Sequence, residues 1–295
     1  MKDICYKGRI EGLEIAFSYS DTTTAVNKAV LLHDCDPVSA HLLGRAITAT
    51  SLGASLLPPK HRLCINWKYP GKLKNIIADV GQDGILRAII NPSHLQNIVE
   101  KNRDIYGDIG EIKTIIKNEK KILNASSTPV SLHDPVNDLS YHFSISDQIE
   151  TSISAVIGFN PNEKTPVRIS RGIMIQALPN CDLDIFERLR KKIEEKEIYE
   201  LLINDKTKNS VDLIFKELIR NEDSYISHDY NKESTPVFGC TCEVEEKFEA
   251  VLKSLPIPER MEIVREKNPL KINCEFCKKM YEISLEDCIK YWNKK

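Results

Sequence analysis

The sequence predicts an α+β protein: a mixed sheet-and-helix N-terminal domain, an amphipathic helical linker and a small cysteine-containing C-terminal domain. The chain has 295 residues, more than one domain usually holds. In its first part, strand-like and helical segments alternate without a regular βαβ rhythm, and four of its nine cysteines form two close pairs near the C-terminal end. We expect the three parts to span residues 1–181, 182–235 and 236–295.

The first part contains one helix with clear start and stop signals. Asp36 is typical of a helix N-cap, Pro37 suits the first helical position, and Pro58 with Pro59 ends the helix. We therefore predict a helix over residues 37–57.

Alternating apolar residues predict strands in the same part. In HRLCINWKY (residues 61–69) and in LSYHFSIS (residues 139–146), apolar side chains at every second position share one face of a strand. We also expect strands in three apolar stretches, at residues 85–90, 152–159 and 172–178.

Residues 182–235 combine helical periodicity with many charged residues. Their apolar positions recur on one face, which predicts helices whose apolar stripe must be buried against another surface. The stripe consists of Leu183, Ile185, Phe186, Leu189, Ile193, Ile198, Leu201, Leu202, Val211, Leu213, Ile214, Phe215, Leu218 and Ile219. The polar stretch at residues 224–239 predicts a hinge before the last part.

The last part, residues 236–295, is too small to bury much apolar surface. We predict a helix over residues 243–255, a hairpin over 270–284 whose turn holds one cysteine pair, and a final helix that begins with a capping box of Ser284 and Asp287. A unit of this size with a thin core usually needs disulfides or a metal.

The two cysteine pairs differ in spacing. One residue separates Cys240 from Cys242 in GCTCE, and two residues separate Cys274 from Cys277 in NCEFCK. Four thiolates complete a tetrahedral zinc site, and two cysteines in a hairpin turn are a common half of one. The sequence thus predicts Zn²⁺ as a cofactor held by these four residues in a C-terminal zinc-binding domain. Three roles stay open for it: a structural metal site, a nucleic-acid-binding zinc ribbon and a thiol switch.

Oxidation of such a site would have a large effect on a small domain. Zinc holds thiolates in their nucleophilic form, so an oxidant that attacks one sulfur also removes a metal ligand. Zinc binding contributes about 10 to 16 kcal/mol of apparent free energy, which exceeds the stability of a small domain. We therefore expect the domain to unfold when it is oxidised.

Charge and composition favour a cytoplasmic protein with neither a nucleic acid nor a membrane as its partner. The net charge of −2 gives no electrostatic reason to expect either anionic partner. The N-terminus lacks the continuous apolar segment of a signal peptide, and no run of about 18 apolar residues occurs. In the cytoplasm, where thiols are kept reduced, grouped cysteines more often bind metal or sense redox state than form structural disulfides.

The chain resembles the bacterial redox-regulated molecular chaperone family, the thirty-three-kilodalton heat-shock proteins. The cysteine pairs are the most specific part of the likeness, together with the hairpin and the capped last helix around them. Four stretches of the first part also match the family: LLGRAITAT at residues 42–50, DGILRAIINP at 83–92, LSYHFSISDQ at 139–148 and GIMIQALPNCD at 172–182.

The resemblance implies an ATP-independent holdase that is not an enzyme. Such a protein binds unfolding or oxidatively damaged client proteins and prevents their aggregation. It is inactive when reduced and zinc-bound, and active after forming two disulfides, Cys240-Cys242 and Cys274-Cys277, with unfolding of the zinc domain and the linker. The resemblance also suggests a homodimer of the oxidised form. The absence of a GxxxxGK[ST] phosphate loop agrees with a function that needs no nucleotide.

Two other function classes remain alternatives. A thiol-disulfide oxidoreductase could use the Cys274-Cys277 pair, and a zinc ribbon could bind nucleic acid, although acidic residues beside the cysteines disfavour a phosphate-facing surface. Among the other cysteines, Cys5, Cys64 and Cys181 are scattered and expected to be buried or incidental. Cys288 lies close to the cluster in sequence, but its place on an amphipathic helix favours core packing.

Overall fold

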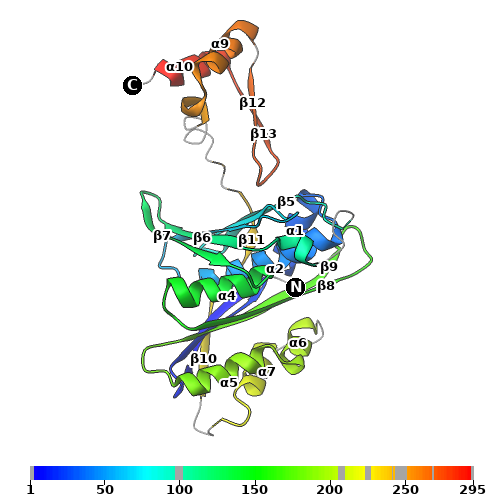
Figure 1. The fold of residues 1–295 in the computed structure, drawn as a ribbon, viewed down its shortest axis with the longest axis vertical. Coiled ribbons are helices and arrows are strands. Elements are labelled where there is room, and N and C mark those ends of the chain that lie inside the picture. Colours follow the sequence, from blue (N-terminus) through cyan, green and yellow to red (C-terminus); the bar gives the residue numbers. More distant parts are fainter. Residues whose placement is uncertain are drawn as a thin grey trace. The chain divides into compact units, whose positions relative to one another are not determined.

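The computed structural model describes residues 3–96, 102–204, 210–222, 227–240, 242, 251–267 and 269–293. The chain divides into two compact units, Met1–Phe238 and Gly239–Lys295. The first unit holds two β-sheets, and the second holds a single hairpin with helices (Figure 1).

The first sheet of the larger unit has five strands in the order β10-β1-β2-β9-β8. All neighbouring strands in it are antiparallel. The strands are β1 (Ile4–Glu11), β2 (Ile15–Asp21), β8 (Thr151–Phe159), β9 (Val167–Ala177) and β10 (Ser227–Ser234). The predicted strands at residues 152–159 and 172–178 are therefore confirmed.

The second sheet has six strands in the order β11-β5-β4-β3-β6-β7. The short β11 pairs with β5 in parallel, and the remaining pairs are antiparallel. The strands are β3 (Arg62–Lys68), β4 (Asn75–Gly81), β5 (Ile85–Asn91), β6 (Gly110–Lys117), β7 (Ile122–Val130) and β11 (Val237–Phe238). The predicted strands at residues 61–69 and 85–90 correspond to β3 and β5.

Helix α2 (Pro37–Ala54) lies between the two sheets and is buried on nearly every side. It contacts strands of both sheets, and α1 (Thr23–Leu32) packs beside it (Figure 1). The short α3 (Asn102–Tyr106) precedes β6. As predicted, Asp36 caps α2: its side chain accepts a hydrogen bond of 2.8 Å from the backbone N–H of Ser39, and Pro37 is the first helical residue.

The predicted strand at residues 139–146 is wrong, because this segment belongs to helix α4 (Pro135–Ser146). The Asp134 carboxylate accepts hydrogen bonds from the backbone N–H groups of Val136 and Asn137, and Pro135 occupies the first helical position. Of the four apolar residues that alternate in this segment, Leu139 and Phe143, four residues apart, are buried, whereas Tyr141 and Ile145 are exposed. Alternation within eight residues fits both structures, and the capping signal upstream decides for the helix.

His142 on α4 is a buried histidine with three hydroxyl partners. Its Nδ1 lies 2.9 Å from Thr128 Oγ1, and its Nε2 lies 3.0 Å from Thr114 Oγ1 and 3.4 Å from Ser126 Oγ. Burial penalises the charged imidazolium and lowers the pKa of His142 to about 4.

This pKa predicts acid sensitivity of the first unit. In the unfolded chain His142 takes up a proton near its ordinary pKa of 6.5, whereas in the folded protein it does so only near pH 4. The unfolded state is therefore stabilised relative to the folded state as the pH falls from 6.5 to 4. We expect a loss of about 1.4 kcal/mol of unfolding free energy per pH unit in this window. Urea unfolding at pH 7 and pH 5 should show a smaller loss in His142→Gln than in the wild type. Equal losses in both proteins would rule out His142 as the source.

Helices α5 (Leu183–Ile193), α6 (Lys196–Ile203) and α7 (Ser210–Leu218) cover the face of the five-stranded sheet opposite α2 (Figure 1). On β9, Met174 packs into the core around α2, whereas Ile173 and Ile175 pack against α5–α7. Most of the predicted stripe is buried there: Phe186, Leu189, Ile193, Ile198, Leu202, Val211, Ile214, Phe215 and Leu218. Leu183 and Leu213 of the stripe are exposed, and Ile185, Leu201 and Ile219 are partly buried against the same core.

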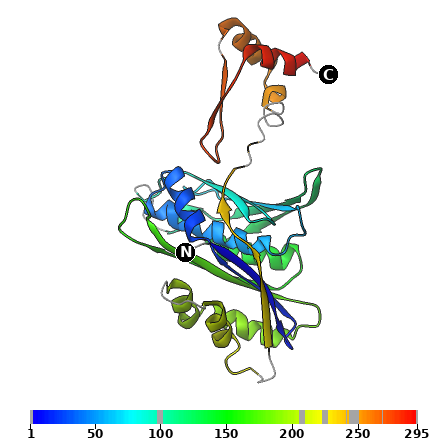
Figure 2. The ribbon, with the colours of Figure 1, turned by 180° about the vertical axis from the view of Figure 1, so that it is seen from behind.

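The predicted hinge is wrong for residues 227–234, which form strand β10 at one edge of the sheet. This strand pairs with β1 from Glu11↔Ser227 to Cys5↔Ser234 (Figure 2). Its Tyr230 packs against Tyr6 at a ring distance of 5.2 Å and donates a hydrogen bond of 2.9 Å to Asp212 on α7. An edge strand has few buried side chains, so its polar sequence resembled a loop. The predicted domain boundaries after residues 181 and 235 stay predictions.

The smaller unit contains α9 (Ile257–Glu266), the hairpin of β12 (Leu270–Asn273) and β13 (Met280–Ile283), and α10 (Leu285–Asn293). The predicted hairpin and capping box are confirmed: Ser284 Oγ accepts from the Asp287 N–H at 3.1 Å and donates to its carboxylate at 2.7 Å. Of the predicted helix at 243–255, the described residues 251–254 are helical, and Val244 and Phe248 lie outside the described residues. Among described residues, the fully buried core of this unit is Leu252, Ile283 and Cys288.

Candidate metal centre

The β12–β13 hairpin places one cysteine pair at its turn. Cys274 follows β12 directly, and its backbone N–H donates to Lys279 O at 3.0 Å while its carbonyl accepts from the Lys278 N–H at 2.7 Å. Lys278 adopts a left-handed conformation with φ of 56°, which closes the turn. These bonds close the turn that carries Cys274 and Cys277.

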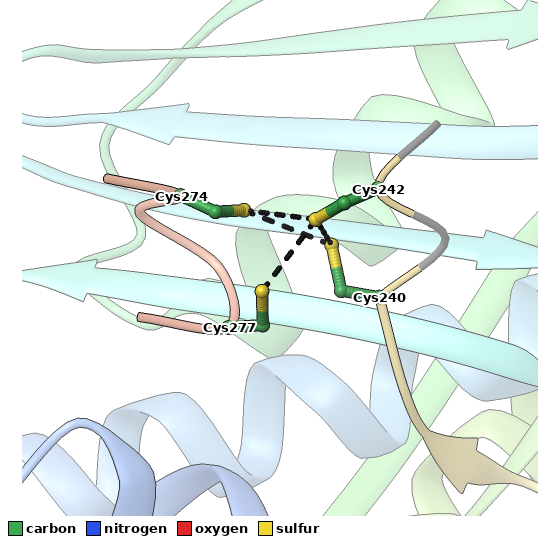
Figure 3. A group of neighbouring side chains, drawn as sticks. All are labelled: Cys240, Cys242, Cys274 and Cys277. Atoms are coloured by element: carbon green, nitrogen blue, oxygen red, sulfur yellow. Dashed lines mark hydrogen bonds between the residues drawn. The ribbon is translucent and has the colours of Figure 1, made fainter. Parts of the chain in front are cut away.

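The other pair lies on the segment that follows β11. Figure 3 shows Cys240 and Cys242 pointing toward the hairpin cysteines. The four sulfur atoms lie within 4.8 Å of one another. The Cys242 Sγ lies 3.0 Å from that of Cys240, 3.3 Å from that of Cys274 and 3.5 Å from that of Cys277, and Cys240 and Cys274 are 3.8 Å apart.

These distances fit metal ligands better than disulfides. No disulfide joins these four described cysteines, because a disulfide would bring two sulfurs to about 2.05 Å. In a tetrahedral site with metal–sulfur bonds of about 2.3 Å, neighbouring sulfurs stand about 3.8 Å apart. The sulfur atoms are therefore close enough together to hold a metal ion after a small expansion, and the donor set is one that could bind zinc.

Electrostatics single out Cys242 as the centre of the cluster. Burial alone would raise the pKa of its thiol, but hydrogen bonding with Cys240, Tyr281 and the two hairpin cysteines lowers it to about 6. Burial and the neighbouring sulfurs raise the pKa of Cys277 instead. The cluster therefore favours a thiolate at Cys242 at neutral pH, and a thiolate is both a nucleophile and a metal ligand. Each of the four cysteines is only half-buried, so a small oxidant can reach them.

The structure brings together all four cysteines that the sequence singled out and leaves the other five apart. Cys288 is fully buried in the core of the smaller unit, which confirms its predicted packing role, and burial raises the pKa of its thiol. Sequence reasoning missed Tyr281, whose hydroxyl is hydrogen-bonded to the Cys242 sulfur. Its place on β13, just past the second cysteine of the hairpin, was the available signal.

Comparison with known proteins extends over nearly the whole chain. Residues 3–284 match the model of the family described as Hsp33 protein. The chain is 27% identical over 274 residues to the 33 kDa chaperonin of Desulfotalea psychrophila, covering 90% of this chain and 89% of that protein. It is 23% identical over 292 residues to the 33 kDa chaperonin of Thermodesulfovibrio yellowstonii, covering 97% of each.

A solved structure has the same fold. The crystal structure of the 33 kDa chaperonin of Thermotoga maritima superposes with a TM-score of 0.78 at 18% identity, covering 99% of this chain and 98% of that one. The predicted α+β fold is thereby confirmed. Within the described residues, no helix combines the length and the apolar character that a membrane crossing requires.

Proposed function

The chain belongs to the Hsp33 family, and we propose that it is a redox-regulated, ATP-independent holdase that acts in the cytoplasm. In this proposal it binds unfolding or oxidatively damaged proteins and prevents their aggregation. It is inactive when reduced and zinc-bound, and it becomes active when its cysteines form disulfides. The observation that carries the proposal is the cluster of four thiols within 4.8 Å in a unit whose fully buried core, among described residues, is three side chains.

Cys240, Cys242, Cys274 and Cys277 would hold the zinc ion in the reduced protein. Soft thiolates select zinc over hard cations such as Mg²⁺ and Ca²⁺. Bound zinc would supply the free energy that joins two chain segments far apart in sequence. The hairpin turn holds Cys274 and Cys277, and the Tyr281 hydroxyl helps to lower the pKa of the Cys242 thiol. All four cysteines are half-buried, so they stay within reach of solvent.

Activation would be a two-electron oxidation at each pair, with a peroxide as oxidant. One thiolate attacks a peroxide oxygen, the O–O bond breaks, and a sulfenic acid forms while one oxygen leaves as water. The second thiol of the pair attacks the sulfenic sulfur, the S–S bond forms and a second water leaves. We propose the products Cys240-Cys242 and Cys274-Cys277, each of which consumes one hydrogen peroxide.

The client-binding surface we propose lies under helices α5–α7. The sheet face beneath them is apolar and would be exposed if these helices left it: Ile10, Ile15, Phe17, Tyr19, Val156, Ile173 and Ile175. Loss of order that spreads along the chain from the oxidised smaller unit into residues 182–235 would uncover this face. An apolar patch of this kind suits unfolded clients of many sequences. We also propose that the oxidised form can associate into a homodimer.

An aggregation assay tests the function directly. A thermally unfolding client is mixed with reduced or peroxide-treated protein, without ATP, and light scattering is followed. We expect suppression near equimolar ratios with the oxidised protein only. Equal scattering with both forms would contradict the redox switch, and suppression by neither would contradict the holdase function. Catalytic turnover of a disulfide substrate by the reduced protein would instead favour the oxidoreductase alternative.

The order of disulfide formation is a separate prediction. The ring closed by Cys240 and Cys242 is smaller and expected to be more strained, so Cys274-Cys277 should form first. The short 3.0 Å separation of the Cys240 and Cys242 sulfurs is the feature that would favour the opposite order. A peroxide time course, quenched by thiol alkylation and read by peptide mass mapping, decides between them. Early appearance of the Cys240-Cys242 peptide would refute the predicted order.

A further inference from the structure

The C-terminal end of helix α6 is bound by two arginines of strand β9. The carbonyls at the end of a helix lack partners within the helix and carry partial negative charge. Arg171 Nη1 donates to Asn204 O at 2.8 Å, and Arg168 Nη1 donates to Ile203 O at 3.3 Å. Helix α6 has no basic residue of its own in its last turn. Arg168 and Arg171 of the sheet therefore offset the partial negative charge at the C-terminal end of α6.

Arg171 is the buried member of this pair and is held rigidly. Its side chain is 2% exposed, and its Nε donates to Asp21 Oδ2 at 2.7 Å. The other oxygen of Asp21 accepts from the backbone N–H of Thr23 at 3.1 Å and from its hydroxyl at 2.7 Å. The guanidinium is thus aimed at α6 by a carboxylate that is itself fixed.

The position of the ion pair links it to the covered face. Asp21 and Arg171 are direct partners across β2 and β9. Every second side chain of a strand points to the same face of the sheet. Asp21 therefore lies on the same face as Tyr19, and Arg171 on the same face as Ile173, and this is the face that packs against α5–α7. An added methyl group at Gly158 on β8 would come within 3.0 Å of Ile203 Cδ1, which shows how closely α6 approaches the sheet here.

We infer that Arg171, oriented by Asp21, is a positioning residue that latches helix α6 to the sheet and so sets how readily the helices α5–α7 are released. A buried ion pair adds little to the stability of a fold compared with apolar side chains of the same size. The hydrogen bond from Arg171 to Asn204 O, however, exists only while α6 is docked on the sheet. The inference rests on the proposed function insofar as release of these helices exposes the client-binding face.

The test is amide exchange of the reduced full-length protein. The double variant Asp21→Asn with Arg171→Met removes both charges without leaving a buried carboxylate unpaired. We expect amides of Lys196–Ile203 to exchange about tenfold to a hundredfold faster than in the wild type, the effect of losing one hydrogen bond from a charged donor. Arg171→Lys keeps the charge beside Asp21 and should show a smaller increase. It also serves as the test variant if the double variant does not fold.

A matched control distinguishes the latch from general destabilisation. Arg45 and Asp134 form another partly buried ion pair in the first unit, and Arg45→Met with Asp134→Asn removes it while asparagine still caps α4. Exchange in α6 that is no faster in the Asp21/Arg171 variant than in this control overturns the latch. Faster exchange in α6 without any client protection by the reduced variant leaves the latch standing and counts against the proposed role of the covered face.

Discussion

Replacing Cys274 with serine is expected to abolish zinc binding and to unfold the smaller unit in the reduced protein. Cys274 lies within 3.8 Å of two other cluster sulfurs, and its backbone closes the hairpin turn. Loss of one thiolate removes most of an apparent zinc-binding free energy of about 10 to 16 kcal/mol. Among the described residues of this unit, only Leu252, Ile283 and Cys288 are fully buried, and so small a core cannot replace this contribution.

Metal analysis and amide exchange measure the two effects. The wild type should contain one zinc per chain and protect its hairpin amides, whereas Cys274→Ser should do neither. Cys181→Ser is the matched control, because Cys181 is also half-buried but lies outside the cluster. Unchanged zinc content in Cys274→Ser would refute the proposed ligand set.

Replacing Phe215 with alanine is expected to release helices α5–α7 without oxidation. Phe215 on α7 is fully buried, and its ring packs edge-on against Phe17 at 4.0 Å between centroids. Truncating a buried phenylalanine costs about 3 to 5 kcal/mol. Since these helices form a separate layer on the sheet, we expect the loss to fall mainly on their docking.

The reduced Phe215→Ala protein should therefore suppress client aggregation without peroxide, with zinc still bound. Phe143→Ala is the control, because it truncates another buried phenylalanine, which belongs to the separate core around α2. It should lower the stability of the first unit without activating the reduced protein. Activation by both variants would mean that general destabilisation suffices, and activation by neither would remove α5–α7 from the mechanism.

Signals carried by neighbouring residues could be interpreted from the sequence alone. The start of α2 needed only Asp36 and Pro37, and the last helix needed only Ser284 and Asp287, because a capping group bonds to backbone groups two or three residues away. The spacing within each cysteine pair likewise identified the four sulfurs that the structure gathers. The amphipathic stripe of residues 183–219 predicted burial, although it did not say against which surface.

The remaining features depended on partners distant in the chain. Residues 227–234 become a strand only because β1, more than two hundred positions earlier, offers an unpaired edge. Asp21 and Arg171 meet across 150 positions. The caps, the spacing of the cysteines and the amphipathic periodicity could thus be predicted from the chain, because each depends on residues a few positions apart. The sheet edge, the sheet face and the buried charge that each segment meets could not be predicted in this way, because those free energies arise from contacts that close long loops.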